Sequence, residues 1–477
     1  MKKTLLFASL LMSCGLSALA EPAYVITTDG QTYDEIDGMK IENLWVFDRQ
    51  HVESDYTISK ICNTSARTAA TDGKYVYVAV SGDQAEIYKY KMDTGHCEGL
   101  LTLTKDGEAF GGTLCCNQIG FDEYDHMYIA TYSANSDGSG QYNVYTVDKK
   151  TGAVASVGDL FFDGGIGRVD FCDVIGDITG AQANCTIMAM SDAQDNMNVF
   201  QWVRKKGNDS FEGGWTDGAT FQAIKAGDTY PNSVVGFSYG SVVKMVRDGS
   251  KSGDMSMFYI DGFTSLPALY GSDGAMIDNI GAADLIVKDK ETKEVISGTL
   301  PEPAAGTNGI AEAKVGDQNL MVYSEGQYDA PHCCQAIVTA VNSDMEFSSM
   351  KYLWTVPADG LGQTSDSGTR QHCLTSVPQE DGSMLLLTFK CFNGMGVYKI
   401  TGGEGSVAKT LANAANITVN GDVIAVSETA QSIEVYNLAG QKVAEAHNAT
   451  EVAAPAQGVY VVKAVVAGAP VVKKVIL

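Results

Sequence analysis

The chain has 477 residues, more than a single hydrophobic core of about 250–300 residues accommodates, so more than one domain is expected. Its formal net charge of −25 argues against nucleic-acid binding, because neutralising phosphates requires clustered lysine and arginine. An apolar fraction of 45% argues against intrinsic disorder, and 51 glycines beside 10 prolines suit a chain with many tight turns.

The N-terminus is organised like a secretory signal. Two lysines open the chain, residues 4–11 are apolar, and Ala18-Leu19-Ala20 matches an A-x-A cleavage site. We therefore expect residues 1–20 to be a signal peptide, and the protein to be extracellular or on the outer-membrane surface, with the periplasm as the alternative. A lipoprotein start at Cys14 is the competing interpretation. No other stretch reaches the ~20 apolar residues needed to span a bilayer.

The body of the chain, residues 21–405, repeats one pattern at intervals of roughly 50–70 residues. Each unit has an apolar strand, a turn, a strand rich in β-branched and aromatic residues, and a third strand. Acidic-glycine turns such as Asp72-Gly73 and Asp381-Gly382 are typical of hairpins. The second strands are expected at residues 75–79, 127–130, 186–190, 257–260, 320–323 and 384–388.

This repeat predicts an all-β fold, a six-bladed β-propeller. An apolar segment, Leu44–Asp48, stands alone before the first unit. We expect it to supply the missing outer strand of the last unit and so to close the ring. An array of β-sandwiches, or two barrels, is the alternative architecture.

The last segment, residues 410–477, changes to an Ala- and Val-rich composition. It contains Ile433-Glu434-Val435-Tyr436-Asn437-Leu438-Ala439-Gly440-Gln441-Lys442-Val443, then Gly458-Val459-Tyr460-Val461-Val462-Lys463, then Lys473-Lys474-Val475-Ile476-Leu477. In that order these segments resemble the type A C-terminal sorting domain of the bacterial type IX secretion system. The resemblance implies a small Ig-like β-sandwich, a secretion-machinery partner and a bacterium of the Bacteroidetes type. The family's usual N-P segment is missing, and a generic Ig-like module is the alternative.

The cysteines suggest disulfides. The chain has 11 cysteines, and removal of Cys14 with the signal leaves ten, an even number in an exported protein. We expect Cys373 to pair with Cys391 across one hairpin, and Cys172 with Cys185 across another. Zinc binding by residues 332–334 with residues 372–373 is the alternative, but no C-x-x-C spacing is present and we predict no metal and no cofactor.

One face of the predicted propeller collects most of the chemically distinctive residues. It carries the loops between blades and the loops between second and third strands, and hence Cys62, Cys115, Cys116, Cys333, Cys334, Cys373 and Cys391. Three scarce arginines precede or begin inner strands, where their forked donors suit carboxylate or phosphate. Pairing with the many acidic residues is the competing interpretation. The predicted ligand-binding set at the axial mouth is Arg67, Arg168, Asn308, His332, Arg370 and His372.

One enzyme motif occurs by pattern, because residues 236–240 fit G-x-S-x-G. The flanking residues are typical of strands, whereas a nucleophile elbow requires a strand followed by a helix. We therefore expect a non-enzymatic secreted or surface binding protein, with a glycan or a protein as ligand and an anionic group, such as an acidic sugar, as the favoured chemistry. A glycan-active hydrolase or lyase on the same face, or a structural adhesin, is the alternative.

Overall fold

The computed structural model describes the chain in segments. They are residues 28–48, 56–132, 141–158, 160–161, 168–193, 196–213, 224–225, 242–247, 250–262, 265–280, 286–288, 295–297, 309–324, 335–362, 372–402, 417–420, 423–437, 441–453, 456, 458–466 and 469–476.

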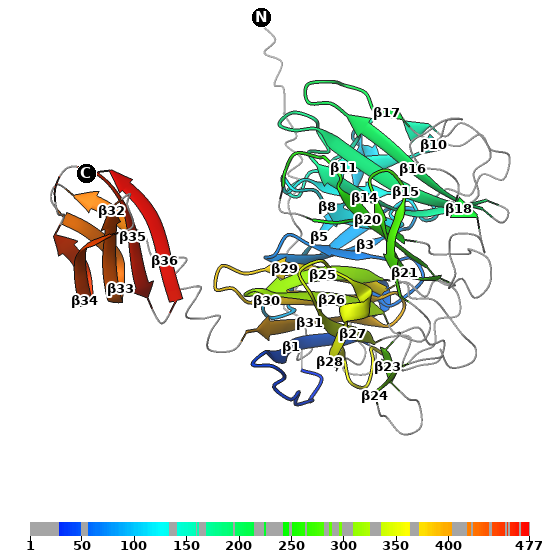
Figure 1. The fold of residues 1–477 in the computed structure, drawn as a ribbon. Helices are drawn as coiled ribbons and strands as arrows, with labels where there is room; N and C mark the ends of the chain where they lie inside the picture. Colours follow the sequence, from blue (N-terminus) through cyan, green and yellow to red (C-terminus); the bar gives the residue numbers. More distant parts are fainter. Residues whose placement is uncertain are drawn as a thin grey trace, which may run out of the picture.

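Six antiparallel sheets of the described residues make up the body (Figure 1). The third sheet has five strands and the others have four, and in the first five blades the strands follow chain order from the inside outward. Blade one consists of β2 (Ala69–Thr71), β3 (Tyr75–Val80), β4 (Glu86–Lys91) and β5 (Cys97–Thr102). Blade two consists of β8 (Gln118–Phe121), β9 (Met127–Ala130), β11 (Val144–Val147) and β12 (Val154–Ser156). Blade three consists of β14 (Arg168–Gly176), β15 (Cys185–Ala193), β16 (Asn196–Arg204) and β17 (Glu212–Gly213), with β18 (Ile224–Lys225) also paired to β16. Blade four consists of β19 (Val242–Met245), β20 (Met257–Gly262), β21 (Ser265–Gly271) and β22 (Met276–Asn279). Blade five consists of β25 (Ile310–Val315), β26 (Gln318–Ser324), β27 (Ala336–Val341) and β28 (Lys351–Val356).

The sixth blade joins the two ends of the ring. It consists of β29 (His372–Pro378), β30 (Met384–Lys390), β31 (Gly394–Thr401) and, outermost, β1 (Lys40–Asp48). The predicted closing strand is therefore confirmed, because β1 pairs antiparallel with β31 from Lys40 opposite Thr401 to Asp48 opposite Gly394. Trp45 fixes this strand, since its indole is 1% exposed and donates to the carbonyl of Met92 in blade one at 2.9 Å.

Hydrophobic clusters fill each junction between neighbouring blades. Side chains of blades one and two meet around Tyr77 and Ile129, and those of blades five and six around Val338 and Leu386. Corresponding clusters lie between blades two and three, three and four, four and five, and six and one. One buried cluster per junction is the arrangement expected of a closed six-bladed propeller, with each sheet packed face to face on the next.

Short elements lie in the loops between and within the blades. They are α1 (Tyr56–Ile61), the 3-10 turn η2 (Phe347–Ser349), β6 (Thr104–Lys105), β7 (Glu108–Ala109), β10 (Gln141–Tyr142), β13 (Leu160–Phe161), β23 (Ile286–Lys288) and β24 (Val295–Ser297). The predicted acidic-glycine turns are present, since the Asp72 carboxylate accepts the backbone N–H of Lys74 at 3.0 Å and Gly73 has φ +84. Within the described residues, none of the helices has the length and apolarity to span a membrane.

The C-terminal module has its own core. Its strands are β32 (Ile417–Asn420), β33 (Val423–Asn437), β34 (Lys442–Ala453), β35 (Val459–Val466) and β36 (Ala469–Ile476), in the order β32-β33-β35-β36 with β34 also on β33 (Figure 1). The ladder of β33 with β34 is irregular between Ala425 and Ala430, and the two halves of β33 have different neighbours, β32 before this point and β35 after it. Both halves contribute to one cluster that includes Ile424, Ile433 and Val462.

Candidate ligand site in the axial channel

A cavity of about 710 Å³ lies along the propeller axis, lined by the first strands of all six blades. Its walls include residues from Ala69 of β2, Ile119 of β8, Asp173 of β14, Lys244 of β19 and Glu312 of β25, and residues 373–376 of β29. The volume is within the range of small-molecule sites, about 300–1,000 Å³. The channel is therefore the candidate ligand site of the described residues.

Acidic and basic side chains from four blades meet at one end of this channel. The Arg247 guanidinium donates through Nη1 to Asp173 Oδ2 at 2.9 Å and through Nη2 to Asp173 Oδ1 at 2.8 Å. Its Nε lies 2.8 Å from Glu123 Oε1, and its backbone N–H donates to Glu312 Oε1 at 2.9 Å. Such a bidentate pair is the geometry in which arginine binds carboxylate most strongly.

These contacts leave Arg247 with little capacity for a ligand. The guanidinium also donates to the carbonyls of Met245 and Val174, at 2.9 Å and 2.8 Å. Burial opposes its charge, but the attraction of Asp173 and Glu123 raises the pKa of Arg247 further. We conclude that Arg247 holds blades two, three and four together at the channel end where the first strands finish.

Lys244 contrasts with Arg247. Its Nζ donates to the backbone carbonyl of Leu374, across the channel on β29, at 3.3 Å. Among the described residues no carboxylate lies within ion-pair distance of this ammonium group. Burial lowers the pKa of Lys244, and the nearby charges of Asp173 and Glu312 oppose that effect only in part. The channel wall thus carries a cation whose charge is incompletely compensated.

A second ammonium group, that of Lys390, lies near β29. Lys390, at the end of β30, is 0% exposed, and its Nζ has no hydrogen-bond partner among the described residues. Burial raises the pKa of the Cys373 thiol to about 11, while Lys244 and Lys390 both lower it electrostatically. Two cations therefore act on Cys373 at the channel wall, although burial outweighs their effect on its pKa.

Glu312 and Glu123 bring carboxyl groups to the same channel end. Burial raises the pKa of Glu312 and of Glu123, although Arg247 opposes the rise at both. These channel residues were not predicted from the sequence. Glu123, Asp173, Arg247 and Glu312 lie on or just after first strands of four blades, at least 50 residues apart in the sequence, so only the folded ring reveals their proximity.

Arg67 is not a free anion-binding group in the structure. Its Nη1 lies 3.9 Å from Asp170 Oδ1, a side chain that is 3% exposed, and 3.3 Å from Asn117 Oδ1. Its Nε donates to the carbonyl of Thr64 at 3.4 Å. The competing interpretation, pairing with an acidic residue, describes Arg67 better than ligand recognition does.

The other predicted ligand-binding residues are described only in part. Arg168 and His372 begin β14 and β29, so their backbones stand at the start of inner strands as predicted, and their side chains lie outside the described residues. The remaining predicted features outside the described residues are the signal at 1–20, the motif at 236–240, Asn308, His332 with Cys333 and Cys334, and Arg370.

Neither predicted disulfide is formed among the described residues. Cys185 lies opposite Gly176, whereas Cys172 lies opposite Ala189, so the two cysteines are four residues apart along the hairpin. At about 3.3 Å per residue this separation exceeds the roughly 7 Å that a disulfide spans.

The thiols of the other predicted pair face different backbone groups. Cys373 Sγ lies 3.9 Å from the carbonyl of Arg67, whereas Cys391 Sγ lies 3.8 Å from that of Asn63. Both cysteines pack in the hydrophobic cluster between blades six and one. They therefore serve as small apolar side chains of that junction.

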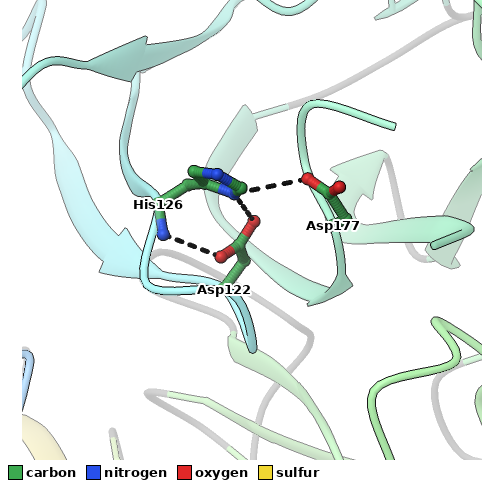
Figure 2. A group of neighbouring side chains, drawn as sticks. All are labelled: Asp122, His126 and Asp177. Carbon is green, nitrogen blue, oxygen red and sulfur yellow. Dashed lines mark hydrogen bonds and ion pairs between the residues drawn. The ribbon is translucent and has the colours of Figure 1, made fainter. Parts of the chain in front are cut away.

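A histidine between two aspartates joins the turns of blades two and three (Figure 2). His126 Nδ1 lies 2.9 Å from Asp122 Oδ2 and 3.3 Å from Asp177 Oδ1. Asp122 also accepts the backbone N–H of His126 at 2.8 Å and of Ile178 at 2.8 Å. Because these oxygens already accept backbone donors, the group acts as a clamp between two turns, and sequence analysis missed it.

The comparisons with known proteins concern the fold alone. No protein-family model and no curated protein matches the chain. A DUF4623 family protein from Bacteroides eggerthii is similar at 12% identity and a TM-score of 0.45, over 78% of this chain and 77% of that one. A subtype N10 neuraminidase-like protein of A/little yellow-shouldered bat/Guatemala is similar at 9% identity and a TM-score of 0.37, over 79% and 99%. The Dos1 propeller is similar at 10% identity and a TM-score of 0.31, over 70% and 67%. Likenesses this distant carry no information about ligand or activity.

Proposed function

We propose that this chain is an exported, non-enzymatic binding protein whose ligand places an anionic group in the axial channel beside Lys244. The observation that carries the proposal is the contrast between two cations of one blade. Arg247 is neutralised by Asp173 and Glu123, whereas Lys244 has a single carbonyl partner among the described residues. A carboxylate or phosphate would complete the hydrogen bonding of that ammonium group and offset the cost of its burial.

The charged groups near Cys373 also support an anionic ligand. Lys390 adds a second buried ammonium group that acts on Cys373, and Cys373 lines the channel. In a protein of net charge −25, an ammonium group without a carboxylate partner among the described residues, such as Lys244, is a distinctive feature of the channel wall. An acidic sugar combines such a charge with hydroxyl groups for the backbone donors and acceptors of the channel wall.

Export is part of the proposal. It rests on the signal pattern at residues 1–20 and on the resemblance of residues 410–477 to a type IX sorting domain. We propose that the C-terminal module directs passage across the outer membrane. The periplasm remains the alternative location, and a chain ending at residue 402 tests it: the propeller should fold, because its closing strand is β1, yet fail to reach the cell surface.

The carboxyl group of Glu312 supports a second candidate function, that of a glycan-active hydrolase or lyase. This carboxyl lines the channel and burial raises its pKa, which is a property of general acids. A partner carboxylate is also required by most glycosidases, and Asp173 is committed to Arg247. We therefore place the enzyme second, and the test is turnover of any bound glycan by the protein and by Glu312→Gln.

The binding test is a glycan and peptide array with the mature protein, Lys244→Met and the control Lys351→Met. Lys351 is exposed and pairs with Asp37 at 2.6 Å on the outside of blade five. Retention of acidic glycans by the mature protein and Lys351→Met, with loss in Lys244→Met, is the expected result. Equal retention by all three proteins, or hits confined to neutral compounds, contradicts the proposal.

A further inference from the structure

Two consecutive cysteines lie in the loop that leads from blade one into blade two. The Sγ atoms of Cys115 and Cys116 are 3.9 Å apart, with Cys115 7% exposed and Cys116 0% exposed. The Cys116 backbone N–H donates to the Ser81 hydroxyl at 3.0 Å, which fixes the loop against blade one. The two thiols are therefore held side by side before any bond joins them.

The local chemistry makes one of these thiols the nucleophile. A hydrogen bond with Cys116 lowers the pKa of the Cys115 thiol to about 7, although burial opposes this effect. The same hydrogen bond and deeper burial raise the pKa of Cys116. Because the thiolate is the reactive form, Cys115 is the residue that attacks and Cys116 the residue that resolves.

We propose that Cys115 and Cys116 form a redox modification site, in which thiol–disulfide exchange with a disulfide oxidant joins the two sulfur atoms in a vicinal disulfide. The Cys115 thiolate attacks the oxidant and expels one thiolate, forming a mixed disulfide. Cys116, losing its proton to that leaving group, then attacks Cys115 Sγ and expels the second thiolate. The two cysteines are oxidised, and the oxidant disulfide is reduced to two thiols.

Covalent geometry makes this bond reversible. Consecutive Cα atoms are about 3.8 Å apart across a trans peptide, whereas disulfides usually span about 4.4–6.8 Å. The vicinal bond is therefore strained, and strained disulfides are the more easily reduced, regulatory class. This distinguishes the pair from the permanent bridges that the cysteine count suggested.

The pair adjoins a junction of three blades. Asn117 follows Cys116, accepts from Arg67 in blade one and donates to the carbonyl of Asp170 in blade three. Its own carbonyl accepts from the Thr68 hydroxyl at 3.4 Å. Oxidation would stiffen the loop that positions Asn117 at the start of the inner strands.

Peptide mapping of the full mature protein tests the inference directly. The protein is incubated with oxidised glutathione, free thiols are alkylated under denaturing conditions, and the peptide spanning residues 115–116 is analysed. A peptide lacking two hydrogens and carrying no alkyl group is expected, with both alkyl groups appearing when dithiothreitol precedes alkylation. Two alkylated cysteines after oxidation, or a link from either one to another peptide, overturns the proposal.

Substitutions supply a second readout. We expect the urea midpoint of the wild type and of the control Cys97→Ser to differ between oxidised and reduced protein, and that of Cys115→Ser not to differ. Cys97, on β5, is a partly buried thiol in a different cluster. An equal shift in Cys115→Ser assigns the redox effect to other cysteines and contradicts the proposal. If Cys115→Ser does not fold, the peptide map of the wild type still decides.

Discussion

Arg247 and Asp173 form a two-point ion pair inside the axial channel, with Nη1–Oδ2 at 2.9 Å and Nη2–Oδ1 at 2.8 Å. The residues come from neighbouring blades, since Asp173 lies on β14 and Arg247 follows β19. Asp173 Oδ2 also accepts the backbone N–H of Met245 at 2.6 Å. One carboxylate thus fixes both the side chain and the first strand of blade four.

Removing the charge of Asp173 should destabilise the propeller. Asp173→Asn leaves Arg247 partly buried without its bidentate partner, a change that typically costs about 3–5 kcal/mol. Arg247 is 32% exposed and retains Glu123, so we expect the lower end of that range. Urea unfolding measures the loss, with Asp37→Asn, which breaks an exposed pair, as the control. A loss as small as that of the control would contradict the role given to Asp173.

Substitutions that weaken the packing of the closing strand β1 should also destabilise the propeller. Trp45→Ala removes a buried indole and its bond to Met92, and large-to-small aromatic substitutions in cores cost about 3–5 kcal/mol. Trp45→Phe keeps most of the packing, so it should cost less. A Cβ on Gly95 would lie 2.6 Å from the indole, so Gly95→Ala should also destabilise the closure. Equal unfolding midpoints for wild type and Trp45→Ala would show that β1 does not hold the ring closed.

Ligand binding should weaken as the pH rises. Lys244 binds an anion as ammonium, and burial lowers its pKa, so the charged form is lost at a lower pH than for an ordinary lysine. Asp173, Glu312, Arg247 and Cys373 also face this group, and ionisation of Glu312 would weaken binding in the same direction. Lys244→Arg separates these effects, because arginine stays charged. Affinity measured against pH should therefore fall more steeply in the wild type than in Lys244→Arg; parallel declines would point to Glu312 alone.

The His126 clamp should be indifferent to metals. Asp122 and Asp177 already accept backbone and hydroxyl hydrogens, and such bonds to Asp177 lower its pKa despite the opposing effect of burial. Zinc or calcium should leave the melting temperature unchanged, whereas His126→Ala should lower it by removing the link between two turns. A zinc-dependent rise in melting temperature that His126→Ala abolishes would identify a metal site instead.

The positions of the strands could be predicted from the sequence, but the residues that line the axial channel could not. Six second strands and the closing strand Leu44–Asp48 could be predicted, because alternating apolar residues and acidic-glycine turns are local signals. The Cys172–Cys185 pairing failed because the ladder sets Cys172 opposite Ala189 and Cys185 opposite Gly176, a register that no spacing rule records. Lys244, Arg247 and Asp173 were missed because a lone charged residue in a strand carries no local signal. The role of Asp173 depends on Met245 and Arg247, which lie 72 and 74 positions away along the chain.

A crystal structure of the mature protein with an acidic sugar retained by the array would show whether the axial channel is the ligand site. We predict a carboxylate in the axial channel within hydrogen-bond distance of Lys244 Nζ, with Arg247 still paired to Asp173. Density for the sugar on the outer surface, with Lys244 still bound only to the carbonyl of Leu374, would contradict the assignment of the channel as the ligand site.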